Sequence, residues 1–111
     1  MITTHVLDTA RGIPAVGVSV VLEMRQQGEW HPIGRGTTDA GGRLTTLTRD
    51  RPLQSGTYRL TFDVATYHRE QGLGTVFFAD VQVAFTVHDP GAHYHVPLLL
   101  SPFGYSTYRG T

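Results

Sequence analysis

The chain has 111 residues, of which 40% are hydrophobic and 16% charged, a composition typical of one folded domain over residues 1–111. Nine arginines balance nine acidic residues, so no broad charge of one sign is present to attract nucleic acid or an anionic membrane. Neither cysteine nor lysine occurs, which excludes disulfides, cysteine zinc ligands, a thiol nucleophile and a Schiff-base lysine.

We expect neither a signal peptide nor a membrane-spanning segment in this chain. Residues 1–5 do not resemble a signal peptide, because no basic start is followed by an apolar stretch. No apolar run approaches the ~20 residues that span a bilayer. We therefore expect a cytoplasmic protein without a membrane partner.

Alternation of apolar and polar residues with a period of two predicts strands in the first third of the chain. Ile2–Asp8 is the first of them, and the alternation is clearest in Val16–Met24. Residues 26–29 (QQGE) are expected to turn the chain. Trp30–Thr38 is then the returning strand, which Pro32 restricts to a sheet edge or a bulge.

Turn-forming residues separate five more predicted strands. These strands are expected at Arg43–Thr46, Thr57–Val64, Val81–Val87, Tyr94–Leu100 and Tyr105–Tyr108. The turns and loops are expected at residues 39–42, 50–56, 88–91 and 101–104. Ala65–Gln71 lacks the alternation and predicts a short helix that ends at Gly72. About eight short strands and one short helix predict an all-β fold, an antiparallel β-sandwich.

Two histidines occupy one face of a predicted strand. His93 and His95 are two residues apart, and the residues that alternate with them are apolar and expected in the core: Tyr94, Val96, Leu98 and Leu100. The histidine face is therefore turned toward solvent, a cavity or a partner chain. It could bind a metal if a third ligand arrived, although two solvated histidines beside a turn are the commoner arrangement.

His5 and Arg43 receive no special role from their local sequence. A lone strand histidine is more often structural or solvated than catalytic, and an arginine after a glycine turn is ordinary on a surface. The six histidines are nevertheless the main groups that can exchange protons near neutral pH.

The C-terminal segment is richer in functional groups than most chain ends, which fray and carry nondescript polar residues. Residues 105–111 (YSTYRGT) offer phenols, a guanidinium, a flexible glycine and a free carboxylate. These groups could bind a small, polar, planar ligand through several hydrogen bonds. A last edge strand with exposed tyrosines explains the same residues equally well.

Four segments, taken together, resemble the transthyretin-related family of 5-hydroxyisourate hydrolases. Residues 4–15 (THVLDTARGIPA) are similar to the N-terminal signature of that family, and residues 37–43 (TTDAGGR) to its T-x-x-x-G-R segment. Residues 93–102 (HYHVPLLLSP) and the ending at 105–111 resemble its third and terminal signatures. The terminal motif is usually Y-R-G-S and separates the hydrolases from transthyretin itself, so Thr111 is one departure that keeps the hydroxyl and adds a methyl group.

The resemblance implies a transthyretin-like sandwich that forms a homotetramer, with sites at the dimer–dimer interface. It implies catalytic roles for His5, Arg43, His95 and Tyr108. The substrate-binding positions that it implies are His5, Arg43, Tyr108, Arg109, Gly110 and Thr111. His93 is a candidate for a supporting position beside the site, and the family implies neither a metal nor another cofactor.

The implied reaction opens the six-membered ring of 5-hydroxyisourate and gives 2-oxo-4-hydroxy-4-carboxy-5-ureidoimidazoline in urate breakdown. Water attacks a ring carbonyl, so a base, donors for the developing oxyanion and contacts to the planar ring are needed. His5 or His95 can act as the base, since imidazole titrates near pH ~6.5. Arg43 carries a fork of donors suited to carbonyl oxygens or an anionic substrate.

Three other functions remain open at this point. A transthyretin-like carrier would bind a small aromatic ligand without turnover, although the tail and His5 argue for the hydrolase. A metal-binding protein would use His93 and His95, with His5 or His88 as a third ligand. An accessory β-sandwich would only mediate assembly.

Overall fold

The computed structural model describes residues 1–49 and 51–111, so Asp50, part of the predicted loop 50–56, lies outside the described residues. The described elements are β1 (Ile2–Asp8), β2 (Ile13–Pro14), β3 (Ser19–Gln26), β4 (Glu29–Thr37), β5 (Arg43–Leu44), β6 (Gly56–Phe62), α1 (Val64–Glu70), β7 (Val81–Val87), β8 (Tyr94–Ser101) and β9 (Gly104–Thr107). The predicted strands and the predicted helix are all found, and the two-residue strand β2 is an addition.

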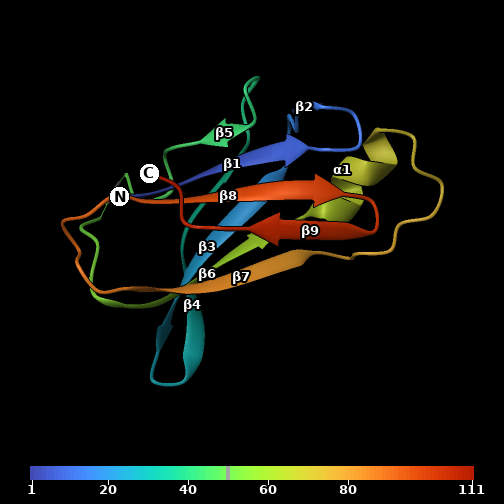
Figure 1. Cartoon of the computed structure of the whole chain (residues 1–111). Helices are drawn as coiled ribbons and strands as arrows, with labels where there is room; N and C mark the ends of the chain where they lie inside the picture. The colour runs from blue at the N-terminus through green and yellow to red at the C-terminus, as the bar shows by residue number, and fades with distance from the viewer. Residues whose placement is uncertain (50) are drawn as a thin grey trace.

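The strands form two packed sheets, as Figure 1 shows. The first has the order β2-β1-β8-β9, with β5 also paired to β1, and the second has the order β4-β3-β6-β7. In Figure 1, α1 lies at the end of the sandwich away from the two termini, which lie near each other. The predicted β-sandwich with one short helix is confirmed.

One strand pair differs from the antiparallel pattern that the sequence predicts. β1 and β8 run parallel over seven residue pairs, from Ile2 opposite Tyr94 to Asp8 opposite Leu100. The two strands are far apart in sequence and are not joined by a hairpin, so their direction is free of the constraint that a tight turn imposes. This pairing places residues from both ends of the chain side by side.

The core lies between the sheets and follows the predicted alternation. Tyr58, Leu60 and Phe62 are buried from β6, and the apolar face of β8 is buried as expected. Val16 is the exception, because it is 50% exposed and lies outside the strand. The reason is Gly17, whose φ of +81° turns the chain before β3 begins at Ser19.

The β3–β4 hairpin forms for local reasons. Gln27 and Gly28 both have positive φ, 54° and 79°, which suits a two-residue turn whose twist matches the strands. β4 is an edge strand, and its register against β3 shifts between Leu22 and Glu23, close to Pro32. The edge position and bulge predicted from Pro32 are both confirmed.

Helix α1 begins one residue before the predicted position and shortens the predicted strand Thr57–Val64. The Asp63 carboxylate accepts a hydrogen bond from the Thr66 amide and caps the helix, so the strand ends at Phe62. At the other end Gly72 has a φ of +88° and its amide donates to the carbonyl of Arg69. This is the left-handed helix ending for which glycine is preferred.

Asp8 connects the first sheet to helix α1. Its buried carboxylate accepts hydrogen bonds from the amides of Ala10 and Arg11 and from the Tyr67 hydroxyl, the last at 2.8 Å. Burial, together with the hydrogen bond to Asp8, raises the pKa of the Tyr67 phenol above its ordinary value. The phenol therefore stays a hydrogen-bond donor at any physiological pH.

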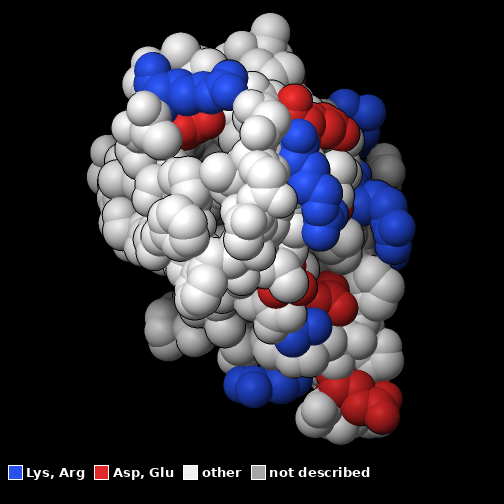
Figure 2. Space-filling model, turned by 90° about the vertical axis from the view of Figure 1, so that its right-hand side faces the viewer, with Lys and Arg blue, Asp and Glu red and all other residues white. Residues whose placement is uncertain are grey.

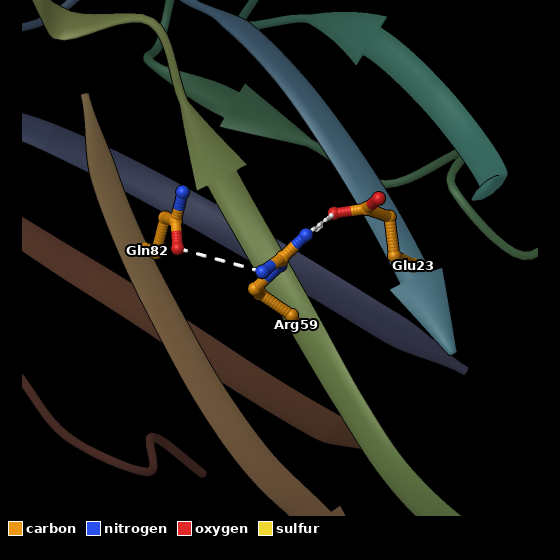
Figure 3. A network of polar contacts seen from close by, with 3 residues as sticks. All are labelled: Glu23, Arg59 and Gln82. Atoms are coloured by element: carbon orange, nitrogen blue, oxygen red, sulfur yellow. Dashed lines mark hydrogen bonds and ion pairs between the residues drawn. The ribbon is translucent and has the colours of Figure 1, made fainter. Parts of the chain in front are cut away.

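A cluster of interacting side chains on the outer face of the second sheet spans its four strands. Arg59 of β6 pairs with Glu23 of β3 at 2.7 Å and donates to Gln82 of β7 (Figure 3). Its guanidinium also lies 4.3 Å from the ring centre of Trp30. Partly exposed pairs of this kind contribute about 1 kcal/mol or less, so they support the strand register rather than drive folding.

On the face that Figure 2 shows, charged side chains of one sign do not gather in a large patch. Arginine and acidic side chains alternate there among uncharged residues. None of the helices in the described part of the chain is long and apolar enough to cross a membrane.

Replacing Tyr67 by Phe tests the link between Asp8 and α1. The substitution leaves the buried carboxylate of Asp8 one donor short, and we expect the free energy of unfolding to fall by about 1–3 kcal/mol. Tyr105→Phe is the matched control, because Tyr105 is 43% exposed and its hydroxyl has no partner among the described residues. Equal chemical denaturation midpoints for wild type and Tyr67→Phe would contradict the assigned role.

Candidate active site

Strand register brings the predicted histidines together on the outer face of the first sheet. Thr3 of β1 lies opposite His95 of β8, and His5 of β1 lies opposite Arg43 of β5. Directly opposed residues project to the same side of a sheet, and Thr3 and His5 share one side of β1. Three neighbouring strands thus present these side chains on one face.

His5 is oriented by the turn at residues 39–42. Its Nε2 lies 2.8 Å from the carbonyl oxygen of Gly41, which can only accept, so Nε2 carries a proton. A neutral His5 therefore has its lone pair on Nδ1, where it can accept a proton. The loop itself is fixed by Asp39, whose carboxylate accepts from the amides of Gly41 and Arg43 at 2.9 Å each.

Asp39 stays ionised in this turn. The hydrogen bond from the Arg43 amide is the main cause of a pKa below the ordinary carboxyl value, with further help from the Gly41 amide and the charge of Arg43. Gly42, with a φ of +77°, lies so close to β1 that a Cβ would be 2.5 Å from the Val6 carbonyl oxygen. The predicted turn is thus built to hold both Gly41 and Arg43 against β1.

His95 is surrounded by groups that disfavour its protonation. Burial lowers the pKa of its imidazole, and Coulombic interactions with His93, Arg43 and His5 lower it further. Its Nδ1 lies 2.8 Å from the hydroxyl of Thr3. His95 is therefore held neutral at pH 7 and can accept a proton.

A hollow of about 220 Å³ lies against this face. The residues around it come from both chain ends and from β5: Met1, Thr3, Thr4, Arg43, Thr45, His93, His95 and Thr111. Arg43, His95 and Thr111, predicted from three separate signatures, thus meet at one small cavity. His5 is not among the residues around it and lies opposite Arg43 in the strand register. Its size suits a small polar molecule.

The last residues of the chain are fastened to β8 beside His95. The Gly110 amide donates to the His95 carbonyl at 2.7 Å, and the Thr107 hydroxyl donates to the carbonyl of Pro97, also at 2.7 Å. A Cβ on Gly110 would lie 2.7 Å from Cδ2 of the His95 ring. Only glycine lets the backbone cross the imidazole this closely.

Tyr108 and Arg109 are not among the residues around the hollow of about 220 Å³. They line a second, larger hollow of about 530 Å³ between β7 and the β8–β9 edge. The Arg109 guanidinium lies 4.4 Å from the ring centre of Tyr94, and its Nη2 approaches the His93 carbonyl at 3.5 Å. The structure therefore brings His5, Arg43, His95, Gly110 and Thr111 together, but not the side chains of Tyr108 and Arg109.

The smaller hollow is the candidate active site because Arg43, His93 and His95 line it. The larger one is mostly apolar, and His88 is the one histidine on its wall. Among residues 1–49 and 51–111, no three His, Cys, Asp or Glu side chains are placed to hold a metal together.

Sequence reasoning missed Thr3 and the carbonyl of Gly41. Thr3 had a signal, because it precedes His5 by two residues and must share its face of the strand. The Gly41 contact had none, since a backbone carbonyl is present at every residue and only the folded turn directs this one at His5.

The pKa of His95 can be followed by NMR titration of its ring. We expect a midpoint below the ordinary value of 6.5, because burial and neighbouring charge disfavour the imidazolium. Arg43→Gln removes one of those charges and should raise the His95 pKa toward that value. Arg35→Gln, an exposed arginine on β4 of the other sheet, should leave it unchanged. A wild-type midpoint above 6.5, or one insensitive to Arg43, would show that this description of the electrostatics is wrong.

Known proteins resemble the chain over nearly its full length. Residues 2–110 match the HIUase/Transthyretin family. A 5-hydroxyisourate hydrolase of Deinococcus radiodurans is 47% identical over 118 residues, which include 99% of this chain and 95% of that protein. The solved structure of Klebsiella pneumoniae 5-hydroxyisourate hydrolase superimposes with a TM-score of 0.85 at 35% identity, covering 99% of this chain and 97% of that one.

Sea bream transthyretin in complex with thyroxine has a TM-score of 0.91 at 35% identity, covering 99% of this chain and 94% of that one. Similarity of fold alone therefore does not distinguish a hydrolase from a protein that binds thyroxine. The distinction has to come from the residues of the site.

Proposed function

The chain belongs to the HIUase/transthyretin family, and from this premise we propose that it hydrolyses 5-hydroxyisourate in urate breakdown. The product is 2-oxo-4-hydroxy-4-carboxy-5-ureidoimidazoline, and one transthyretin-like domain over residues 1–111 carries the activity. The observation that supports this most is the meeting of Arg43, His95 and Thr111 around one small hollow, with His5 beside Arg43 in the strand register. A cytoplasmic location stays a prediction.

The reaction proceeds by attack of water on a ring carbonyl. One imidazole takes a proton from the water as its oxygen bonds to the carbonyl carbon. The tetrahedral intermediate then collapses with cleavage of the ring C–N bond, and the proton passes to the departing nitrogen. Acid–base help of this kind is worth about 10²–10⁴-fold in rate.

His5 and His95 divide the proton transfer and orientation between them. The neutral state of His95 at pH 7 makes it ready to accept a proton from water, and His5 presents a lone pair on Nδ1. Either ring can take the proton while the other orients water or substrate. No lysine, cysteine or metal is needed for this step.

Arg43 and the chain end bind the substrate. The Arg43 guanidinium can bind adjacent carbonyl oxygens through two donors and stabilise the oxyanion as it develops. Gly110 and Thr111 form the wall beside His95, where the Thr111 hydroxyl and carboxylate add polar contacts. Arg109 supports them by holding the tail against the Tyr94 ring. Within one chain, Tyr108 and Arg109 line the larger hollow, so they do not contact the substrate directly.

Assembly completes the site in this proposal. The histidine face is open in the single chain, since Arg43 and His93 are exposed. A homotetramer with this face at a dimer–dimer interface would cover it with a partner and exclude bulk water from the substrate. The edge strands β7 and β9 are free in each sheet to pair between chains.

Substitution of the three central residues tests the catalytic assignment. His5→Ala, His95→Ala and Arg43→Ala should each lower kcat/KM for 5-hydroxyisourate, the histidine variants by about 10²–10⁴-fold. Substrate is generated by a urate oxidase and its absorbance is followed. His31→Ala is the control, because His31 is exposed on β4 of the other sheet. Near-wild-type turnover in all three variants would defeat the assignment.

Removal of residues 108–111 tests the tail. The truncated chain loses the wall beside His95 but keeps β9, so we expect loss of activity with little change in the far-UV circular dichroism spectrum. Gly110→Ala should act in the same direction, because its methyl group meets the His95 ring. Gly104→Ala is the matched glycine control, since a Cβ there makes only an ordinary contact at 3.8 Å. Full kcat/KM in the truncated protein would mean that the tail is passive.

A carrier function is the second candidate, favoured by the likeness to the thyroxine complex and by the large apolar hollow. It predicts ligand binding without turnover. Binding of an aromatic ligand by a protein that leaves the decay rate of fresh 5-hydroxyisourate unchanged would support the carrier over the hydrolase.

A further inference from the structure

A threonine hydroxyl links His95 of β8 to His93, which comes directly before that strand. Oγ1 of Thr3 lies 2.7 Å from Nε2 of His93 and 2.8 Å from Nδ1 of His95. Thr3 itself is only 3% exposed, whereas His93 is exposed and His95 half-buried. No other side-chain or backbone partner of this hydroxyl is found in the described part of the chain.

The single proton of the hydroxyl couples the two rings. If Thr3 donates to His93, then Oγ1 accepts from His95, whose proton is on Nδ1 and whose Nε2 is bare. If Thr3 donates to His95 instead, Nδ1 of His95 is bare and the proton of that ring moves to Nε2. Acceptance from both rings at once would leave the hydroxyl proton without an acceptor among the described residues, which costs about 1–3 kcal/mol.

The contact with Gly110 shows which ring atom of His95 faces the tail. A Cβ on Gly110 would meet Cδ2 of His95, the atom bonded to Nε2, and Thr111 follows on the wall of the hollow. Nδ1 is turned the other way, to Thr3. The atom available to water or substrate is therefore Nε2, and the ring can act as a base only when Nε2 is bare.

We propose that Thr3 is a positioning residue that keeps Nε2 of His95 bare, and that His93 controls it by accepting the hydroxyl proton. The inference rests on the proposed hydrolase function. In the active state His93 is neutral with its proton on Nδ1, Thr3 donates to His93 Nε2, and His95 Nδ1 donates to Thr3. The chain thus uses the exposed histidine to select the tautomer of the half-buried one.

Protonation of His93 reverses this arrangement. The added proton occupies Nε2 of His93, which then donates to Thr3. The hydroxyl turns to Nδ1 of His95, and exchange with water moves the His95 proton to Nε2, so the base is lost. The other charged groups near the pair are the Met1 ammonium, the guanidiniums of Arg43 and Arg109, the His5 imidazole and the Thr111 carboxylate.

Thr3→Val and Thr3→Ser form a matched test, because Val keeps the shape and Ser keeps the hydroxyl. We expect Thr3→Val to lower kcat by about 10–100-fold with KM little changed, and Thr3→Ser to retain most of kcat. Thr37→Val, on the exposed edge strand β4, should behave as wild type. Wild-type kcat in a folded Thr3→Val protein would overturn the proposal.

Ring-nitrogen NMR gives a readout that does not depend on turnover. In wild type at pH 7.5 we expect His95 with a proton on Nδ1 and a bare Nε2, and in Thr3→Val a mixture of tautomers. A bare Nδ1 in wild type would contradict the inference even if the protein is an active hydrolase. A wild-type protein that shows the expected tautomer but no hydrolysis would instead contradict the proposed function.

His93→Gln examines the other end of the link. The amide oxygen of Gln can always accept from Thr3 and is never protonated in this range, so the acid limb of the kcat profile should move to lower pH. An acid limb that matches wild type would remove the controlling role of His93. This variant also keeps the proposal testable if Thr3→Val does not fold.

Discussion

The parallel pairing of β1 with β8 is the constraint on which the rest of the site depends. Its register sets Thr3 opposite His95, and a shift by one residue would turn every side chain of β1 to the other face of the sheet. The same register buries Ile2 and Val6 in the core, so the apolar packing that stabilises the sandwich also fixes the histidine face. The geometry of the proposed site and the stability of the fold thus depend on one strand pair.

Two glycines then allow the 39–42 turn and the tail to pack closely against that strand pair. Gly42 brings the 39–42 turn against Val6, and Gly110 brings the chain end across the His95 ring. In both places the backbone approaches too closely for a side chain, so the site is enclosed by main chain rather than by large residues. The result is a small polar hollow in which burial and neighbouring positive charge keep His95 neutral.

Much of the fold could be predicted from sequence because the signals are local: the alternation of β6, the proline on β4 and the glycine after α1 each act within a few residues. The parallel pairing of β1 with β8 could not be predicted, because no local sequence pattern indicates which distant strands become neighbours. The family signatures identified His5, Arg43 and His95, but the direction of the Tyr108 side chain depends on how the tail crosses β8. The spacing to His5 places Thr3 on the same face of β1, but its contacts with both histidines form only in the folded strand pair.

The central claim is that the reaction takes place on the histidine face and not in the larger apolar hollow. A crystal structure with an unreactive purine analogue that keeps the carbonyl groups of 5-hydroxyisourate tests it most directly. The account predicts the analogue in the hollow of about 220 Å³, with Arg43 on its oxygens and His95 beside a ring carbonyl. An analogue bound instead in the hollow of about 530 Å³, against Tyr108 and away from His95, would contradict it.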